Sequence, residues 1–181
     1  MENRIIILDT ETTGLSPKMG HRLIEIGCLE MIDLKLTGNS YQTYIQPCRL
    51  VDEGAMRVHG VTDAMLADKP RFKDIYRQFL SFIGDSKLVA HNAQFDMGFI
   101  NHELSLLLGA FMPYSAAFNI YDSRTIICTK KMAQALYGPG GNKLDELCDK
   151  FGINRENRTL HGALIDCELL AEVYVKLMET E

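Results

Sequence analysis

Four acidic residues and one histidine occupy three short patches that lie far apart along the chain. Asp9 and Glu11 stand in the first patch, Asp96 in the second, and His161 with Asp166 in the third. Carboxylates attached to apolar segments are costly to desolvate alone, and hard divalent cations hold such groups well. We therefore expect the three patches to meet at a metal site that is suited to phosphodiester hydrolysis.

The first patch is the stretch 8–14, Leu-Asp-Thr-Glu-Thr-Thr-Gly, which follows a run of apolar residues. Residues two apart on a strand face the same way, so Asp9 and Glu11 can project together into one site. At such a short separation, two carboxylates repel each other unless a cation lies between them. An acidic pair at a strand end is also common for structural reasons, so this patch alone is weak support.

The other two patches carry the remaining acids and the histidine. Asp96 falls in the first turn of a predicted helix, where the helix dipole favours negative charge. His161 and Asp166 would be separated by about 140° on a continuous helix. They can reach a common site if His161 precedes the helix and Gly162 lets the chain turn. Taken alone, Asp96 is explained as a favourable first-turn acid and His161 as a helix-entry residue.

Composition limits the class of protein. The 181 residues fit one domain, 1–181, and 46% hydrophobic with 24% charged residues is ordinary for a globular chain. A net charge of -5 argues against binding nucleic acid through a broad basic surface. The five cysteines form no C-x-x-C pair, and no apolar run approaches the length of a membrane span. We expect no disulfide scaffold, no membrane contact and a cytoplasmic location.

Periodicity predicts an α/β organisation. The sequence predicts strands at about 4–9, 23–32 and 41–45, with a turn at 37–40, and later strands at 87–90 and 118–121. It predicts helices at 52–58, 62–66, 72–83, 92–108, 123–136, 142–151 and 162–178, with Asn92 starting one of them and Asp122 capping another. Three antiparallel strands followed by parallel β-α units indicate a mixed central sheet flanked by helices. This organisation resembles the ribonuclease-H-like fold.

The motifs in their order resemble a known family. Asp-x-Glu, then Asp, then His with Asp five residues later is similar to the DEDDh family of 3′-to-5′ exonucleases. Within that family the sequence is most similar to the proofreading epsilon subunits of bacterial DNA polymerase III. Beyond the motifs, the likeness rests on 58–60, 142–148, 158–166 and 170–174, and it extends from Ile5 to about Leu177.

The resemblance implies a reaction and its cofactors. It implies that two divalent ions, Mg²⁺ or Mn²⁺, are bridged by Asp9 and supported by Glu11, Asp96 and Asp166. His161 would accept the proton of the attacking water, because imidazole titrates near neutral pH. The product would be a nucleoside 5′-monophosphate.

The resemblance also implies contacts with the substrate and with partners. The substrate would be a single-stranded or frayed DNA 3′ end, bound by Thr12, Thr13, Gly14, Leu15, Val58, His59, His91 and Phe95. Core packing or turn formation explains each of these residues about as well. Epsilon-type proteins associate with the polymerase alpha subunit and a small theta-type subunit, and the sequence does not decide either association.

Two other functions stay open on the sequence alone. An exoribonuclease of the same superfamily would use the same chemistry, and the residues do not show whether the pocket tolerates a 2′ hydroxyl. A noncatalytic scaffold subunit would keep the fold without activity, although retention of all five acidic and histidine positions speaks against it. Activity on DNA and RNA oligonucleotides separates these functions.

Overall fold

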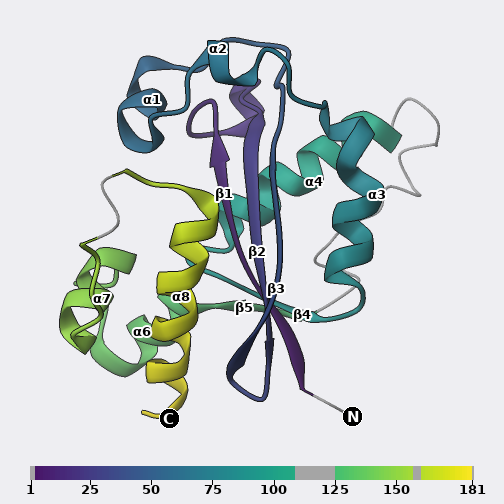
Figure 1. Cartoon of the computed structure of the whole chain (residues 1–181). Helices are drawn as coiled ribbons and strands as arrows, with labels where there is room; N and C mark the ends of the chain where they lie inside the picture. The colour runs from purple at the N-terminus through teal and green to yellow at the C-terminus, as the bar shows by residue number, and fades with distance from the viewer. Residues whose placement is uncertain (1–2, 109–124, 157–159, 181) are drawn as a thin grey trace.

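A five-stranded mixed sheet forms the centre of the computed structural model, which describes residues 3–108, 125–156 and 160–180 (Figure 1). The strand order is β3-β2-β1-β4-β5. The strands are β1 (Arg4–Thr12), β2 (Leu23–Ile32), β3 (Lys35–Tyr44), β4 (Lys87–Ala90) and β5 (Ile126–Cys128). β1 to β3 are antiparallel neighbours, whereas β4 runs parallel to both β1 and β5. The expected mixed sheet is therefore confirmed.

Helices cover both faces of this sheet. They are η1 (Pro17–Met19), α1 (Glu53–His59), α2 (Asp63–Leu66), α3 (Phe72–Ile83), α4 (Gln94–Leu108), α6 (Thr129–Tyr137), α7 (Leu144–Phe151) and α8 (Ala163–Met178). In Figure 1, α3 and α4 lie on one side of the strands and α8, with α6 and α7 beyond it, on the other. α1 and α2 lie near the carboxyl end of β1.

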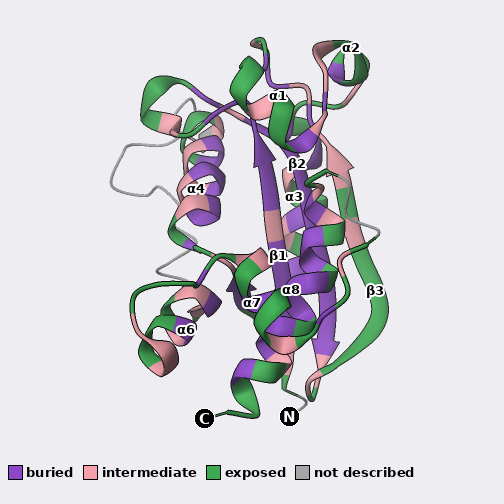
Figure 2. Ribbon diagram, turned by 90° about the vertical axis from the view of Figure 1, so that its left-hand side faces the viewer, coloured by how far each residue is buried: buried purple, intermediate pink, exposed green. Residues whose placement is uncertain are grey.

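β1 is buried on both faces because its apolar residues alternate between two cores. Ile6 and Leu8 pack with the apolar residues of α3 and α4, such as Phe79. Ile5 and Ile7 pack in a second core with residues of α8. Figure 2 shows this burial along β1, β2 and the inner side of α8, whereas β3 is largely exposed. The alternation decides which side chains of β1 face α8 and which face α4.

The hairpin between β2 and β3 turns earlier than the sequence predicts. The chain reverses at Asp33 and Leu34, whose φ angles are 48° and 63°, and β3 begins at Lys35. Positive φ at both central residues matches the twist of the flanking strands. The residues predicted to form the turn, 37–40, instead lie in β3, where Thr37 and Asn39 donate hydrogen bonds to the buried Glu30 carboxylate.

Two predicted helix starts are also corrected. Residues 126–128, placed in a helix by the sequence, form β5 next to β4, and the helix begins at Thr129. Asn92 has a left-handed φ of 66° and forms a turn in which the Phe95 N–H donates to its carbonyl, so α4 begins at Gln94. The predicted strand at 118–121 and the Asp122 cap lie outside the described residues.

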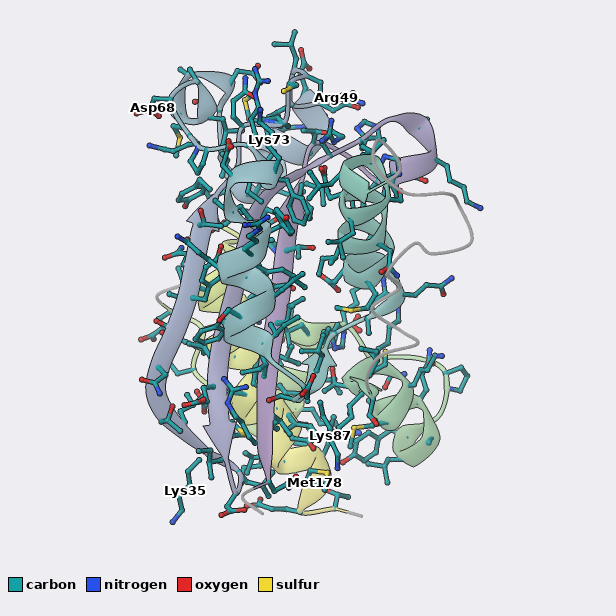
Figure 3. The ribbon with its side chains drawn as sticks, turned by 90° about the vertical axis from the view of Figure 1, so that its right-hand side faces the viewer. Lys35, Arg49, Asp68, Lys73, Lys87 and Met178 are labelled. Atoms are coloured by element: carbon teal, nitrogen blue, oxygen red, sulfur yellow. The ribbon has the colours of Figure 1, made fainter. Side chains whose placement is uncertain are left out.

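The long hairpin gives the molecule two distinct ends. Figure 3 shows Lys35, where β3 begins, at one end and Arg49, which bonds to Asp52 before α1, at the other. The carboxyl end of β1 lies at the Arg49 end. Across the described ranges 3–108, 125–156 and 160–180, no helix combines the length and apolar character required to cross a membrane.

Candidate active site

The two acids of β1 share the face of the sheet that α8 covers. Asp9 and Glu11 continue the alternation of Ile5 and Ile7, which pack against α8. Thr10, one residue out of phase, faces α4 instead, and its hydroxyl donates a 2.8 Å hydrogen bond to the Asp96 carboxylate. One strand therefore presents acids to α8 on one face and fixes the acid of α4 on the other.

His161 and Asp166 meet because the chain turns just before α8. The helix begins at Ala163, and Gly162 before it is extended with a φ of −159°. Outside the helix, the His161 imidazole folds back so that its Nδ1 lies 3.0 Å from the Asp166 Oδ2. Ligand atoms of Glu11, His161 and Asp166 all lie within 4.8 Å of one another. Side chains that are 150 and more residues apart in sequence thus converge on one point.

Among the described residues, the group within 4.8 Å includes neither Asp9 nor Asp96, although the charges of both act near α8. Both carboxylates act on the buried Cys167 of α8, whose pKa is raised first by burial and then by the charges of Asp9, Cys28, Asp96 and Asp166. Asp96 itself is 2% exposed. Burial raises its pKa to about 7, although the Thr10 hydroxyl opposes the shift. A carboxylate whose charged form is disfavoured by burial is suited to a cation partner.

The start of α8 lies unusually close to β2. A Cβ on Gly27 would come within 2.5 Å of the Ala163 carbonyl carbon, so only glycine fits there. The Cys167 thiol, one turn further along α8, donates to the Gly27 carbonyl at 3.3 Å. Gly27 is also the cross-strand partner of Asp9. This close approach sets the distance between the acids of β1 and those of α8.

The donor set fits a divalent metal. Carboxylate oxygens bind Mg²⁺ at about 2.0 to 2.1 Å, so two ligands on opposite sides of one ion lie about 4.2 Å apart. Donor atoms within 4.8 Å of one another come close to that spacing. Glu11 and Asp166 supply carboxylates to the group, and both are buried. His161 is the exposed member of the group, which suits access of its imidazole to water and substrate.

A cavity of about 480 Å³ opens next to the acids. It is lined by Glu11, Thr12, Gly14, Leu15, Met19, His21, Asp52, Gly54, Ala55, Val58, His59 and Phe95. Six of the residues that the sequence suggests for substrate binding are among them: Thr12, Gly14, Leu15, Val58, His59 and Phe95. Leu15 is 86% exposed at this cavity, which leaves its side chain available to a ligand.

Two suggested substrate residues lie elsewhere. Thr13 is fully buried, its backbone pairs with Arg22 and Asp52, and its hydroxyl contacts the His21 ring. It supports the loop around Gly14 and is not part of the lining. The Nδ1 of His91 lies 2.9 Å from the Thr129 hydroxyl. Burial lowers the pKa of His91 to about 4, so the ring is neutral at pH 7.

His59 has a defined tautomer within the cavity wall. The Val61 N–H donates to its Nδ1 at 3.0 Å, so its Nε2 carries the proton and donates to the Thr12 carbonyl at 3.2 Å. Burial lowers the pKa of His59, opposed by the Thr12 carbonyl. A neighbouring backbone bond joins the His161 N–H to the Val58 carbonyl. The end of α1 therefore connects the cavity wall to the segment that carries His161.

Several residues of the site escape sequence reasoning. His21 lies against Gly14, where a Cβ would come within 2.3 Å of the ring, and its Nε2 is 3.6 Å from the Asp52 carboxylate. Met19 and Ala55 add apolar surface to the cavity. None of these residues belongs to the acidic motifs. The one available signal is proximity in sequence, because His21 lies two residues before β2 and Asp52 directly precedes α1.

Comparison with known proteins identifies the family of this chain. The family model RNase_T, described as Exonuclease, matches residues 6–174. The DNA polymerase III subunit epsilon of Rickettsia felis is 48% identical over 174 residues, covering 96% of this chain and 73% of that protein. The protein of the same name from Buchnera aphidicola subsp. Schizaphis graminum is 45% identical over 176 residues, covering 95% and 73%.

Solved structures share the fold. Exonuclease X in complex with 5′ overhanging duplex DNA superimposes with a TM-score of 0.72 and 28% identity, covering 98% of this chain and 92% of that one. The nuclease domain of 3′hExo, a DEDDh family member bound to rAMP, has a TM-score of 0.75 at 19% identity, with coverage of 98% and 92%. At that identity the second likeness shows the fold alone. The chain belongs to the exonuclease family and, within it, to the epsilon subunits of DNA polymerase III.

Proposed function

We propose that this chain is a 3′-to-5′ exodeoxyribonuclease that proofreads DNA for a bacterial replicative polymerase III. It removes nucleotides from DNA 3′ ends as 5′-monophosphates. The observation that carries the proposal is the convergence of Glu11, His161 and Asp166 beside a cavity of about 480 Å³. Acids and a base at the edge of a cavity with a partly apolar lining suit hydrolysis of the last phosphodiester bond of a bound strand.

The acids hold the metal in this proposal. Asp9, Glu11, Asp96 and Asp166 are the ligands, and Mg²⁺ or Mn²⁺ is the cofactor. When bound, two such ions lower the pKa of the attacking water and stabilise the leaving 3′ oxygen. Thr10 keeps the Asp96 carboxylate oriented through its 2.8 Å hydrogen bond.

His161 acts as the general base. Its Nδ1–H donates to Asp166 in the 3.0 Å contact, which leaves the lone pair on Nε2 to accept a proton. Because His161 lies outside the helix and is exposed, Nε2 can reach a water at the scissile phosphate. Asp166 orients the imidazole in the same contact, as carboxylates do for catalytic histidines in other hydrolases.

The cavity receives the 3′-terminal nucleotide. Phe95 and Leu15 offer apolar surface to the base and sugar, and Thr12 and Gly14 offer backbone groups. Val58 and His59 line the cavity from the end of α1. A single-stranded or frayed end fits this arrangement because one unpaired nucleotide must enter alone.

The relatives supply the wider setting of the proposal. They carry the name of a DNA polymerase III subunit, so we take residues 1–181 as one exonuclease domain that associates with that polymerase in the bacterial cytoplasm. The alpha subunit is the proposed main partner and a theta-like subunit an accessory one. Copurification of each subunit with the chain after coexpression tests these two contacts separately.

The function is tested with 5′-labelled oligonucleotides in Mg²⁺. We expect stepwise shortening of DNA from the 3′ end, faster at mispaired than at paired termini, and no shortening in the presence of a chelator. An RNA strand of the same sequence serves as the comparison. Faster degradation of RNA would replace the proposal by an exoribonuclease, and no degradation of either strand would leave a noncatalytic scaffold subunit.

A further inference from the structure

A buried glutamate outside the acidic motifs joins the sheet to the start of α8. Glu25 lies in β2 and is 1% exposed. Its Oε2 accepts a hydrogen bond from the Ala163 N–H at 3.2 Å, and its Oε1 accepts one from the Gln42 side chain at 2.7 Å. Burial and then the charge of Glu25 raise the pKa of the neighbouring Tyr44. Glu25 therefore connects β2, β3 and the first residue of α8.

The register of the sheet places this glutamate opposite a proposed metal ligand. Glu11 on β1 pairs with Glu25 on β2, and Asp9 pairs with Gly27. Both β2 residues contact Ala163, Glu25 through its carboxylate and Gly27 through close backbone approach. Each acid of β1 is thus directly opposite a residue that holds the start of α8.

The first residue of α8 sits between the two functional groups of the third motif. Ala163 follows His161 by two residues and precedes Asp166 by three, within the first turn of the helix. An N–H in the first turn has no partner inside the helix, so a buried one needs another acceptor. Glu25 supplies that acceptor. A shift of this turn would move His161 and Asp166 together relative to Glu11.

We infer that Glu25 is a positioning residue that holds the entry of α8 at the distance from β1 that the metal site requires. Its carboxylate bonds to Ala163 and Gln42, and Glu25 is not one of the residues in the group of Glu11, His161 and Asp166. The inference rests on the proposed function for its effect on rate. The hydrogen bond from the Ala163 N–H to Glu25, called the tether below, is a structural property. Residues that orient metal ligands in this way typically change metal affinity or activity by about 10- to 100-fold when they are replaced.

Three substitutions separate the tether from its charge. Glu25→Gln keeps the reach and an oxygen acceptor for Ala163, and the Gln42 amide can rotate to accept from the new amide. Glu25→Asp keeps the charge but withdraws it from Ala163. Glu25→Ala removes both. Glu30→Gln is the matched control, because Glu30 is also a buried glutamate of β2 but bonds to Arg4 and Asn39, away from the acids.

The readouts are amide hydrogen exchange at 163–166, Mn²⁺ affinity by calorimetry, and kcat and KM on single-stranded DNA. We expect Glu25→Asp and Glu25→Ala to speed exchange at Ala163, to weaken Mn²⁺ affinity about 10- to 100-fold, and to lower kcat similarly while KM changes less than about twofold. Glu25→Gln and Glu30→Gln should stay within about threefold of wild type.

The outcomes are decisive because Glu25→Gln keeps the hydrogen bond to Ala163 and loses the charge, whereas Glu25→Asp keeps the charge and loses the hydrogen bond. An active Glu25→Asp beside an inactive Glu25→Gln would show that charge and not the tether matters, and would overturn the inference. Unchanged exchange at Ala163 in Glu25→Asp would overturn it as well. Faster exchange with intact Mn²⁺ affinity would also contradict it. If wild type lacked exonuclease activity, the proposed function would fail, while exchange and Mn²⁺ affinity would still test the tether.

Discussion

The Nδ1 of His161 lies 3.0 Å from the Oδ2 of Asp166. His161 stands before the extended residue Gly162, whereas Asp166 lies in the first turn of α8. This contact orients the imidazole relative to Asp166. It also places a nitrogen within the group of possible metal ligands. We expect His161 to act as a base and not as a metal ligand, and a substitution tests the two roles separately.

Replacing His161 by alanine is expected to separate these two roles. As the general base, His161 contributes about 10² to 10⁴ in rate, so His161→Ala should lower kcat by that factor. Because the carboxylates of Glu11 and Asp166 remain, calorimetry should show Mn²⁺ affinity close to that of wild type. Loss of Mn²⁺ binding along with the rate would identify His161 as a ligand.

Thr10 should matter although it carries no charge. Thr10→Val is nearly isosteric but removes the hydroxyl that donates 2.8 Å to Asp96. Since that carboxylate is buried, we expect Mn²⁺ affinity to fall by about 10- to 100-fold. Thr10→Ser keeps the hydroxyl and serves as the control. Equal affinities for the valine and serine variants would mean that Asp96 is oriented without Thr10.

Leu15 should act on substrate binding and not on stability. Its side chain is 86% exposed at the cavity. Leu15→Ala therefore removes little buried apolar surface from the folded protein and should leave its stability nearly unchanged. Burial of a leucine by the terminal nucleotide is worth about 1.5 kcal/mol, so KM for single-stranded DNA should rise about tenfold. Leu50 is the matched control, because it is 73% exposed and lies outside this cavity. A similar KM change in Leu50→Ala would refute a specific contact.

His91 should make stability depend on pH. Burial lowers its folded pKa from 6.5 to about 4, so the folded state binds fewer protons than the unfolded state between these values. The free energy of unfolding is therefore highest above pH 6.5, where His91 is neutral in both states, and it decreases as pH falls toward 4. Between pH 7.5 and pH 5 this loss is about 2 kcal/mol.

Urea unfolding of metal-free wild type and His91→Gln at both pH values measures the effect. The wild type should lose about 2 kcal/mol more than the variant on going from pH 7.5 to pH 5. Parallel losses in the two proteins would show that His91 is not held in its neutral form.

Local patterns predict the parts of the fold that depend on periodicity. The run Ile5–Leu8 predicts a strand buried on both faces, and the structure places its alternate residues in two cores. His161 and Asp166 are five residues apart, so they would not share a face of one continuous helix. Their meeting at one site therefore predicts the turn before α8 that the structure shows. These features follow from backbone geometry, which neighbouring residues determine.

Contacts between distant strands and helices are harder to predict. Glu25 and Ala163 are 138 residues apart, and nothing in the local sequence of either residue points to the other. The hairpin turn falls at Asp33 and Leu34 because the register of β2 and β3 overrides the turn tendency of 37–40. His21 and Asp52 likewise meet through the folding of two loops. Tertiary packing decides each of these positions.

The proposed function requires that acids from β1, α4 and α8 together hold the metal ions used in DNA hydrolysis. Single-turnover cleavage of a 5′-labelled single-stranded oligonucleotide in Mg²⁺ by Asp166→Ala tests it most directly, with circular dichroism as the check on folding. The account predicts a folded variant that leaves the 3′ end intact. Cleavage by the folded variant at the wild-type rate would contradict it.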